Sequence, residues 1–116
     1  MSMRFKPRTM KIVGVGMENI APFYHLLGID EVYVVKEAEK DKLHNIINRL
    51  RMREDVAVII IQNRLYNIIK DLVSYQNRLY PIFVSIPDYL DLEKFDIYEF
   101  YKPIIRKYIG FEVTLT

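Results

Sequence analysis

The sequence has no cysteine among its 116 residues, which excludes disulfides, thiolate metal sites and a cysteine nucleophile. Charge of one sign is also lacking, because 17 basic and 15 acidic side chains leave a net charge of only +2. The electrostatic field of the whole chain therefore gives no reason to expect binding to nucleic acid or to an anionic membrane surface. The longest aliphatic run, Val56 to Ile61, is far too short for a transmembrane span, and residues 1–9 lack the apolar run of a signal peptide. These absences favour an intracellular protein.

Strand and helix patterns alternate along a chain long enough for one domain with a real core. The apolar residues predict strands at Lys11–Gly16, Glu31–Val35, Asp55–Ile61 and Pro81–Pro87. Helical patterns lie between them, around Ile20–Leu27 with Gly28 as the cap, over Glu39–Met52, and on a stripe of Leu65, Ile68, Ile69, Leu72 and Val73. Such alternation predicts an α/β fold, with a four-stranded parallel sheet in the flavodoxin-like order 2-1-3-4.

The predicted strand order distributes the helices unevenly. The second and third helices would cover one face of the sheet and the first helix alone the other. The third strand is continuously apolar, as expected when both of its faces are covered. Strands three and four are therefore short of cover on the side of the first helix, where either the end of this chain or a partner would fit.

The last twenty residues predict an amphipathic helix with a broad apolar stripe. Asp96 and Glu99 form a helix start signal, Gly110 suits a C-terminal cap, and Pro103 predicts a kink or a restart of the helix. The stripe follows helical spacing at Ile97, Phe100, Tyr101, Ile104, Ile105 and Tyr108. The expected organisation is a basic N-terminal arm at 1–10, an α/β domain at 11–87, an acidic linker at 88–95, this helix at 96–110 and a tail at 111–116.

The turn after the first strand begins like a dinucleotide-binding fingerprint. Gly14 and Gly16 match the pattern, but Asn19 stands where the third glycine is needed for close approach to a pyrophosphate. The alternative that remains open is a freestanding flavodoxin-like module that binds a nucleotide or another small ligand at the carboxyl edge of the strands. Its candidate crevice consists of Gly16, Glu18, Asn19 and Asn63.

No other pattern carries chemistry. The third strand ends without the aspartate of a phosphoacceptor, and His25 and His44 have no metal-site spacing. The acidic run that starts at Asp88 lacks the glycine and spacing of a calcium loop, so a solvated linker is the expected reading. We expect no catalytic residues, no metal and no cofactor.

The ordered set of motifs resembles the F subunit of the archaeal A-type and V-type rotary ATPases. The resemblance covers Lys11 to Val113, with departures from the family pattern at Met17, Asn19, Pro103 and Tyr108. In chain order the motifs are Gly16-Met17-Glu18-Asn19, Leu26-Leu27-Gly28-Ile29, Arg53-Glu54-Asp55-Val56 with the isoleucines after it, Pro81-Ile82-Phe83-Val84-Ser85-Ile86-Pro87 and Ile105-Arg106-Lys107-Tyr108-Ile109-Gly110.

The resemblance implies a non-catalytic subunit of the central stalk, cytoplasmic and peripheral to the membrane. It implies docking on the coiled-coil D subunit of the rotor, with the terminal helix reaching toward the A and B subunits of the catalytic head, and a role in coupling or regulating ATP hydrolysis or synthesis with ion transport. An apolar helix on a linker also allows a helix-exchanged homodimer of the isolated chain. The implied partner-binding residues are Ile97, Phe100, Tyr101, Ile104, Ile105, Arg106, Lys107, Tyr108 and Ile109.

Overall fold

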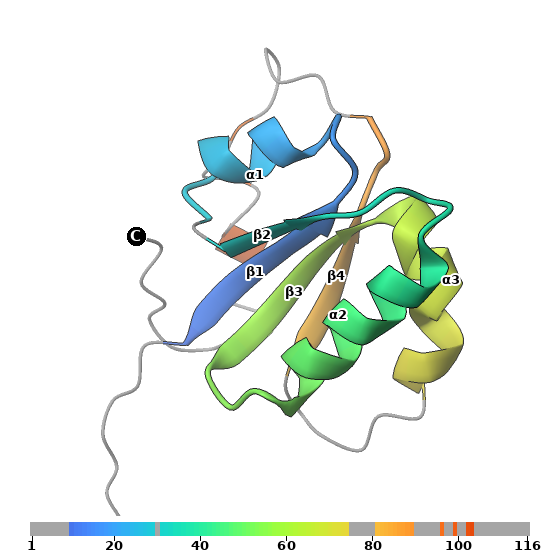
Figure 1. The fold of residues 1–116 in the computed structure, drawn as a ribbon. Coiled ribbons are helices and arrows are strands. Elements are labelled where there is room, and N and C mark those ends of the chain that lie inside the picture. Colours follow the sequence, from blue (N-terminus) through green and yellow to red (C-terminus); the bar gives the residue numbers. More distant parts are fainter. Residues whose placement is uncertain are drawn as a thin grey trace, which may run out of the picture.

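The computed structural model describes residues 10–29, 31–74, 81–89, 96, 99 and 102–103. Its elements alternate along the chain, as the apolar patterns predict (Figure 1). They are β1 (Lys11–Gly16), α1 (Ala21–Leu26), β2 (Glu31–Val34), α2 (Lys40–Met52), β3 (Val56–Gln62), α3 (Asn63–Ser74) and β4 (Ile82–Ile86).

The four strands form one parallel sheet in the order β2-β1-β3-β4. The predicted fold class and strand order are therefore confirmed. One irregularity was not predicted. Lys11 pairs with Val56 but Ile12 pairs with Val58, so β3 carries one extra residue at this step.

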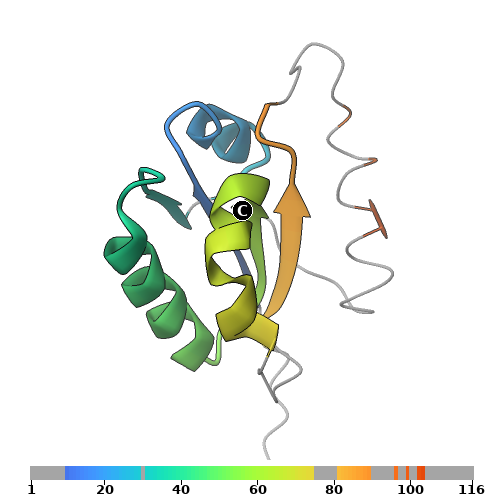
Figure 2. The same ribbon diagram turned by 90° about the vertical axis from the view of Figure 1, so that its right-hand side faces the viewer.

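The sheet divides the core into two layers (Figures 1 and 2). The larger layer lies under α2 and α3, where Leu43, Ile47 and Ile69 pack against strand residues such as Val13 and Ile61. Because apolar helical residues recur every three or four positions, each of these helices presents one continuous stripe to the sheet. Every residue of β3 is buried, which confirms that this strand is covered on both faces.

The smaller layer lies on the opposite face of the sheet. Of the three helices α1, α2 and α3, α1 alone covers this face. Phe23 and Tyr24 of α1 are buried against Val58 and Ile60 of β3, whereas Val84 of β4 is only half buried. The uneven distribution of helices that the strand order predicts is therefore present.

Close approach of α1 to β1 depends on the two strand glycines. A methyl group added at Gly14 would lie 2.7 Å from Cδ2 of Tyr24, and one added at Gly16 would lie 2.2 Å from Cγ2 of Ile20. Gly28 has a φ of 81° and ends the α1 region in the left-handed conformation that glycine adopts without strain. Tyr24 then reaches under α1 to the sheet, where its hydroxyl lies 2.8 Å from the carbonyl oxygen of Val15 and 3.2 Å from that of Ile60.

The predicted start signal of the terminal helix is present. The Glu99 N–H donates to the Asp96 side chain at 3.3 Å, and Glu99, Lys102 and Pro103 are helical. All six residues of the predicted apolar stripe lie outside the residues that the structure describes, as do residues 1–9 of the basic arm and the tail.

Candidate functional site

The polar groups at the carboxyl edge of the sheet converge on the side chain of Gln62, the last residue of β3. Gln62 is completely buried, and it is the one buried polar side chain among the residues that the structure describes. Its Oε1 accepts a hydrogen bond from the Met17 N–H at 2.7 Å. Its Nε2 donates to Asn19 Oδ1 at 3.2 Å and to the Asp88 carbonyl oxygen at 3.0 Å. A buried amide is tolerated because all of its polar atoms have partners.

Asp88, two residues beyond β4, is held by three different elements. Its carbonyl oxygen also accepts a hydrogen bond from Asn19 Nδ2 at 2.9 Å. Its carboxylate accepts the Arg64 N–H at 2.9 Å and lies 3.4 Å from Arg64 Nε. Because Arg64 is in the first turn of α3, the carboxylate caps a helix end that otherwise has free N–H groups. Asp88 therefore differs from the solvated linker residue that the sequence led us to expect.

The β1–α1 turn uses its main-chain amides for its own structure. The Met17 N–H is bonded to Gln62, and the N–H groups of Ile20 and Ala21 both donate to the Met17 carbonyl oxygen. A phosphate cradle needs such amides to point at the ligand. In this turn the N–H groups of Met17, Ile20 and Ala21 are bonded to protein oxygens, and the two glycines make room for α1.

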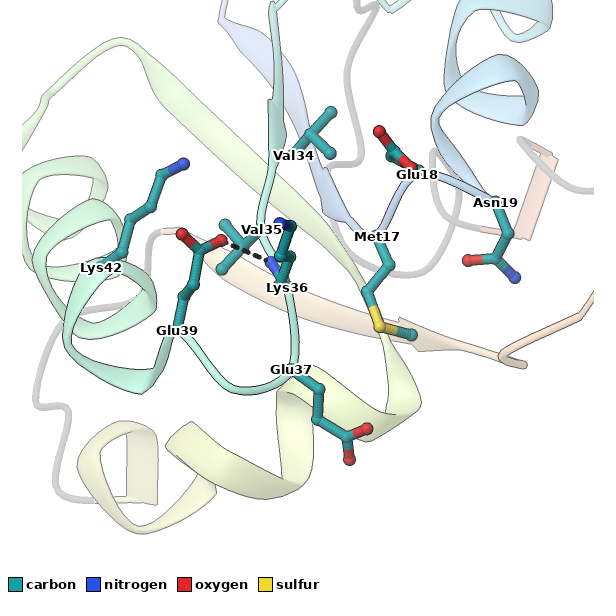
Figure 3. Close-up of a pocket in the computed structure, with 9 residues that line it drawn as sticks. All are labelled: Met17, Glu18, Asn19, Val34, Val35, Lys36, Glu37, Glu39 and Lys42. Carbon is teal, nitrogen blue, oxygen red and sulfur yellow. Dashed lines mark hydrogen bonds between the residues drawn. The ribbon is translucent and has the colours of Figure 1, made fainter.

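A cavity of about 560 Å³ opens beside the turn, between the ends of β1 and β2 and the start of α2 (Figure 3). Val34 and Val35 supply its apolar lining, and the remaining lining side chains are Met17, Glu18, Asn19, Lys36, Glu37, Glu39 and Lys42. Three acids and two lysines give it mixed charge. The carboxylates diverge in Figure 3, where Glu39 accepts the Lys36 N–H at 2.9 Å. The cavity therefore offers no set of side chains converging on one ligand group.

Two of the four predicted crevice residues line this cavity. Glu18 and Asn19 line it, but Gly16 and Asn63 are not among the lining residues. Asn63 begins α3 and accepts a hydrogen bond from the Ser85 hydroxyl at 3.2 Å. The predicted partner-binding residues of the terminal helix lie outside the described residues and remain a prediction; they are Ile97, Phe100, Tyr101, Ile104, Ile105, Arg106, Lys107, Tyr108 and Ile109.

The opposite edge of the sheet carries an ion-pair cluster. The Arg53 guanidinium contacts Asp55 through Nε at 2.9 Å and Nη2 at 2.8 Å, and it also bonds both carboxylate oxygens of Glu31. Lys11 lies 3.8 Å from both acids, and the Tyr33 hydroxyl donates to Glu31 at 2.7 Å. Hydrogen bonds from Arg53 lower the pKa of Glu31 and of Asp55, and those two acids raise the pKa of Arg53.

This cluster gives a structural role to the motif Arg53-Glu54-Asp55-Val56, which was noted above only as part of the family resemblance. Arg53 and Asp55 belong to the segment before the third strand, and their shared partner Glu31 begins β2. The three side chains join the amino ends of β2 and β3, which lie on either side of β1. These ion pairs stabilise the sheet, and they do not form a reactive centre.

Sequence reasoning missed Gln62 and the capping role of Asp88. The one available signal was a polar residue that ends an otherwise apolar strand, since a buried amide there must find partners. Those partners are 26 to 45 residues distant in sequence, and no spacing rule identifies them.

Two kinds of site are absent from the described residues. No group of three or more histidine, cysteine, aspartate or glutamate side chains in this part of the chain could hold a metal ion. None of the described helices has both the length and the apolar character that crossing a membrane requires.

Comparison with known proteins assigns the family. Residues 12–97 match the family model described as ATP synthase (F/14-kDa) subunit. The chain is 37% identical over 102 residues to the F subunit of the A-type ATP synthase of Methanocaldococcus jannaschii, covering 87% of this chain and 96% of the relative. It is 33% identical over 109 residues to the F subunit of the A-type ATP synthase of Pyrococcus abyssi, covering 90% and 98%.

A solved structure, that of the F subunit of the V-type ATP synthase from Archaeoglobus fulgidus, resembles the chain with a TM-score of 0.47 and 22% identity, covering 68% of this chain and 99% of that one. The fold assignment rests on the sheet described above, and the family assignment on the sequence matches. The chain therefore belongs to the ATP synthase (F/14-kDa) subunit family, with the F subunits of archaeal A-type ATP synthases, and is a non-catalytic subunit of that complex.

Proposed function

We propose that this F subunit works by docking, with its α/β domain anchored on the coiled-coil D subunit of the rotor and its terminal helix bound along the rotor toward the A and B subunits of the catalytic head. By changing position, the helix would couple or regulate ATP hydrolysis or synthesis with proton or sodium transport. The protein would then be peripheral to the membrane, in the soluble sector of the complex.

The observation that carries this proposal is the apolar stripe of the terminal helix. Its six large side chains follow helical spacing, and fully burying one such side chain stabilises by about 1.5–3 kcal/mol. The set therefore represents about 10 kcal/mol of gross burial, which is too much to leave in water. The six residues are Ile97, Phe100, Tyr101, Ile104, Ile105 and Tyr108.

Two features of the described residues support a helix of this kind. Asp96 accepts the Glu99 N–H, which is the contact of an N-terminal cap, so the helix has its own start signal separate from the sheet. The face of the sheet opposite α2 and α3 has only α1 among these three helices, and Val84 there is half buried. An α/β domain with one lightly covered face suits a subunit that works through contacts with neighbours.

The amides of the β1–α1 turn that are bonded to protein oxygens disfavour the alternative of a nucleotide-binding module. The Met17 N–H bonds the Gln62 side chain, so this amide is not offered to a phosphate. The nearby cavity has mixed charge and no converging groups. No observation on the described residues favours a small-molecule ligand over a protein partner.

The test is calorimetric titration of the full chain with the D subunit from the same source. Ile104→Glu places a charge in the apolar stripe, and Glu99→Gln changes an exposed polar position of the same helix. We expect Ile104→Glu to weaken binding at least about tenfold, from the lost burial of one large side chain, and Glu99→Gln to bind like the wild type. Wild-type binding of Ile104→Glu would refute a role for the helix in docking on the rotor. No binding by the wild-type chain would refute the docking proposal as a whole.

A further inference from the structure

The chain leaves the α/β domain through a residue that is unusually well held. Asp88 makes two hydrogen bonds through its carbonyl oxygen, with Asn19 and Gln62 as donors, and two contacts through its carboxylate, both with Arg64. The donors come from the β1–α1 turn, the end of β3 and the start of α3. Movement of the β1–α1 turn, of β3 or of α3 alone would therefore leave some of these contacts intact.

One of the partners of Asp88 is a buried side chain. Gln62 is fully buried, and its remaining oxygen is fixed by the Met17 N–H, so its amide cannot turn away from Asp88 without losing a partner in the interior. Asn19 connects the same groups from the surface, because it donates to Asp88 and accepts from Gln62.

Exposure rises sharply from Asp88 to the residue after it. The next residue, Tyr89, is 72% exposed, whereas the Asp88 side chain is only 22% exposed. On the other side of Asp88, Ser85 bonds Asn63, which ties β4 to the start of α3 as well. Asp88 is therefore the last described residue of this segment that bonds back to the domain through both its main chain and its side chain.

We propose that Asp88, Asn19, Gln62 and Arg64 form a positioning cluster, the Asp88 clamp, that fixes the point and direction in which the chain leaves the domain toward its terminal helix. The clamp makes Asp88 the fixed end of the segment that docks on the partner. The role of the clamp in docking rests on the function proposed above. The contacts of the clamp lie within this chain and do not depend on a partner. By restricting where the helix starts, the clamp reduces the ordering cost of docking.

The two halves of the clamp are accessible to separate surface substitutions. Asp88→Ala removes the carboxylate from Arg64, and Asp88→Asn keeps an oxygen that accepts the Arg64 N–H. Asn19→Ala removes both contacts of the exposed Asn19 side chain without touching the buried Gln62. Asp71→Ala, at an exposed acid of the same helix α3, is the matched control.

The first readout is amide hydrogen exchange of Arg64 in the full chain. An amide in the first helical turn has no partner within the helix, so its protection reports the Asp88 carboxylate directly. We expect Asp88→Ala to speed this exchange about fivefold, the equivalent of one lost capping bond, and Asp88→Asn to restore most of the protection. The Asp71→Ala control should leave it unchanged.

The second readout is the direction of the leaving chain. Because the protein has no cysteine, the pair Tyr89→Cys and Asn48→Cys accepts two spin labels at unique exposed sites. We expect the distribution of label distances to broaden in Asp88→Ala and in Asn19→Ala, with the circular dichroism spectrum unchanged. A distribution as narrow as that of the wild type in both variants would overturn the clamp, even if the Arg64 amide exchanged faster.

Binding to the rotor D subunit then separates the two proposals. If the clamp positions the helix for docking, Asp88→Ala and Asn19→Ala should weaken binding several-fold, while Asp71→Ala should not. A wild-type chain that does not bind the rotor would refute the docking function. The hydrogen-exchange and label-distance results would then still decide whether the clamp exists. Full affinity in both clamp variants, with broadened distances, would overturn its role in docking.

Discussion

The packing around Gly16 predicts a specific energetic cost for one added methyl group. In Gly16→Ala the new carbon would lie 2.2 Å from Cγ2 of Ile20, 3.1 Å from Cε2 of Tyr24 and 3.2 Å from Oε1 of Gln62. Carbon atoms in contact are normally about 3.5–4.0 Å apart. Ile20 is only 1% exposed and cannot swing into solvent, so α1 has to move away from β1.

Two opposing effects set the magnitude. Overpacking of a filled core typically costs about 1–3 kcal/mol. The conformation of Gly16 is open to alanine, because Gly28 is the one glycine with positive φ among the described residues, and Gly→Ala then gains about 0.4–1 kcal/mol by restricting the unfolded chain. Since the overlap with Ile20 is severe, we expect the packing cost to win, with a net loss of about 1–2 kcal/mol.

The assay is urea unfolding of Gly16→Ala, Ile20→Ala and the double variant. We expect a lower midpoint at an unchanged slope, which indicates a change in stability without a change in the surface exposed on unfolding. Ile20→Ala alone should cost about 2–5 kcal/mol. In the double variant the new methyl group fills part of the space that Ile20 vacates, so the combined loss should be smaller than the sum by about 1 kcal/mol or more.

An unaltered midpoint in Gly16→Ala would refute the packing argument. Simple additivity in the double variant would show that Ile20 is not the group with which the methyl collides. Either result would reopen the interpretation of the turn as a ligand site, and nucleotide titration of the wild type would follow.

Three further predictions concern stability. Tyr24→Phe removes a hydroxyl that lies near two strand carbonyl oxygens and should lower the free energy of unfolding by about 1 kcal/mol, measured by chemical denaturation. Gly28→Ala should cost about 1 kcal/mol because φ is 81°, while Gly28→Asn should cost less; thermal unfolding of both variants is the check. Arg53 lowers the pKa of Glu31 and of Asp55, so its contribution is present above their unfolded values, which are near 4.5 and 3.8, and is lost as the pH falls through the lowered folded values. In Arg53→Met the free energy of unfolding should therefore fall less steeply as the pH is lowered, measured by urea unfolding at a series of acidic pH values. The same dependence on pH as in the wild type would contradict this role of Arg53.

The architecture was predictable because it follows from the spacing of apolar residues within each strand and helix. The continuous apolar run of β3 indicates cover on both faces, and the helical stripes assign α2 and α3 to the sheet surface. Right-handed crossovers then leave few orders for four parallel strands. The cap at Gly28 and the start signal at Asp96 are equally local, and both are present.

The polar contacts were not predictable because they join distant parts of the chain. The Met17 N–H and Gln62 are 45 residues apart, and Asn19 and Asp88 are 69 apart. Nothing in the spacing of Asp88 separates a helix cap from one more solvated acid. The extra residue in β3 is likewise invisible, since a run of aliphatic residues reads the same in either register.

The route of the chain through the sheet has a mechanical consequence. The described chain enters at the amino end of β1 and leaves at the carboxyl end of β4, and β3 lies between these parallel strands. Tension between residue 10 and Tyr89 therefore pulls β1 and β4 in opposite directions along their lengths. The hydrogen bonds of both ladders are then loaded together in shear, and none can open alone as in a peeled hairpin. Pulled from these two points, the domain should behave as a stiff link whose strength comes from its central strand.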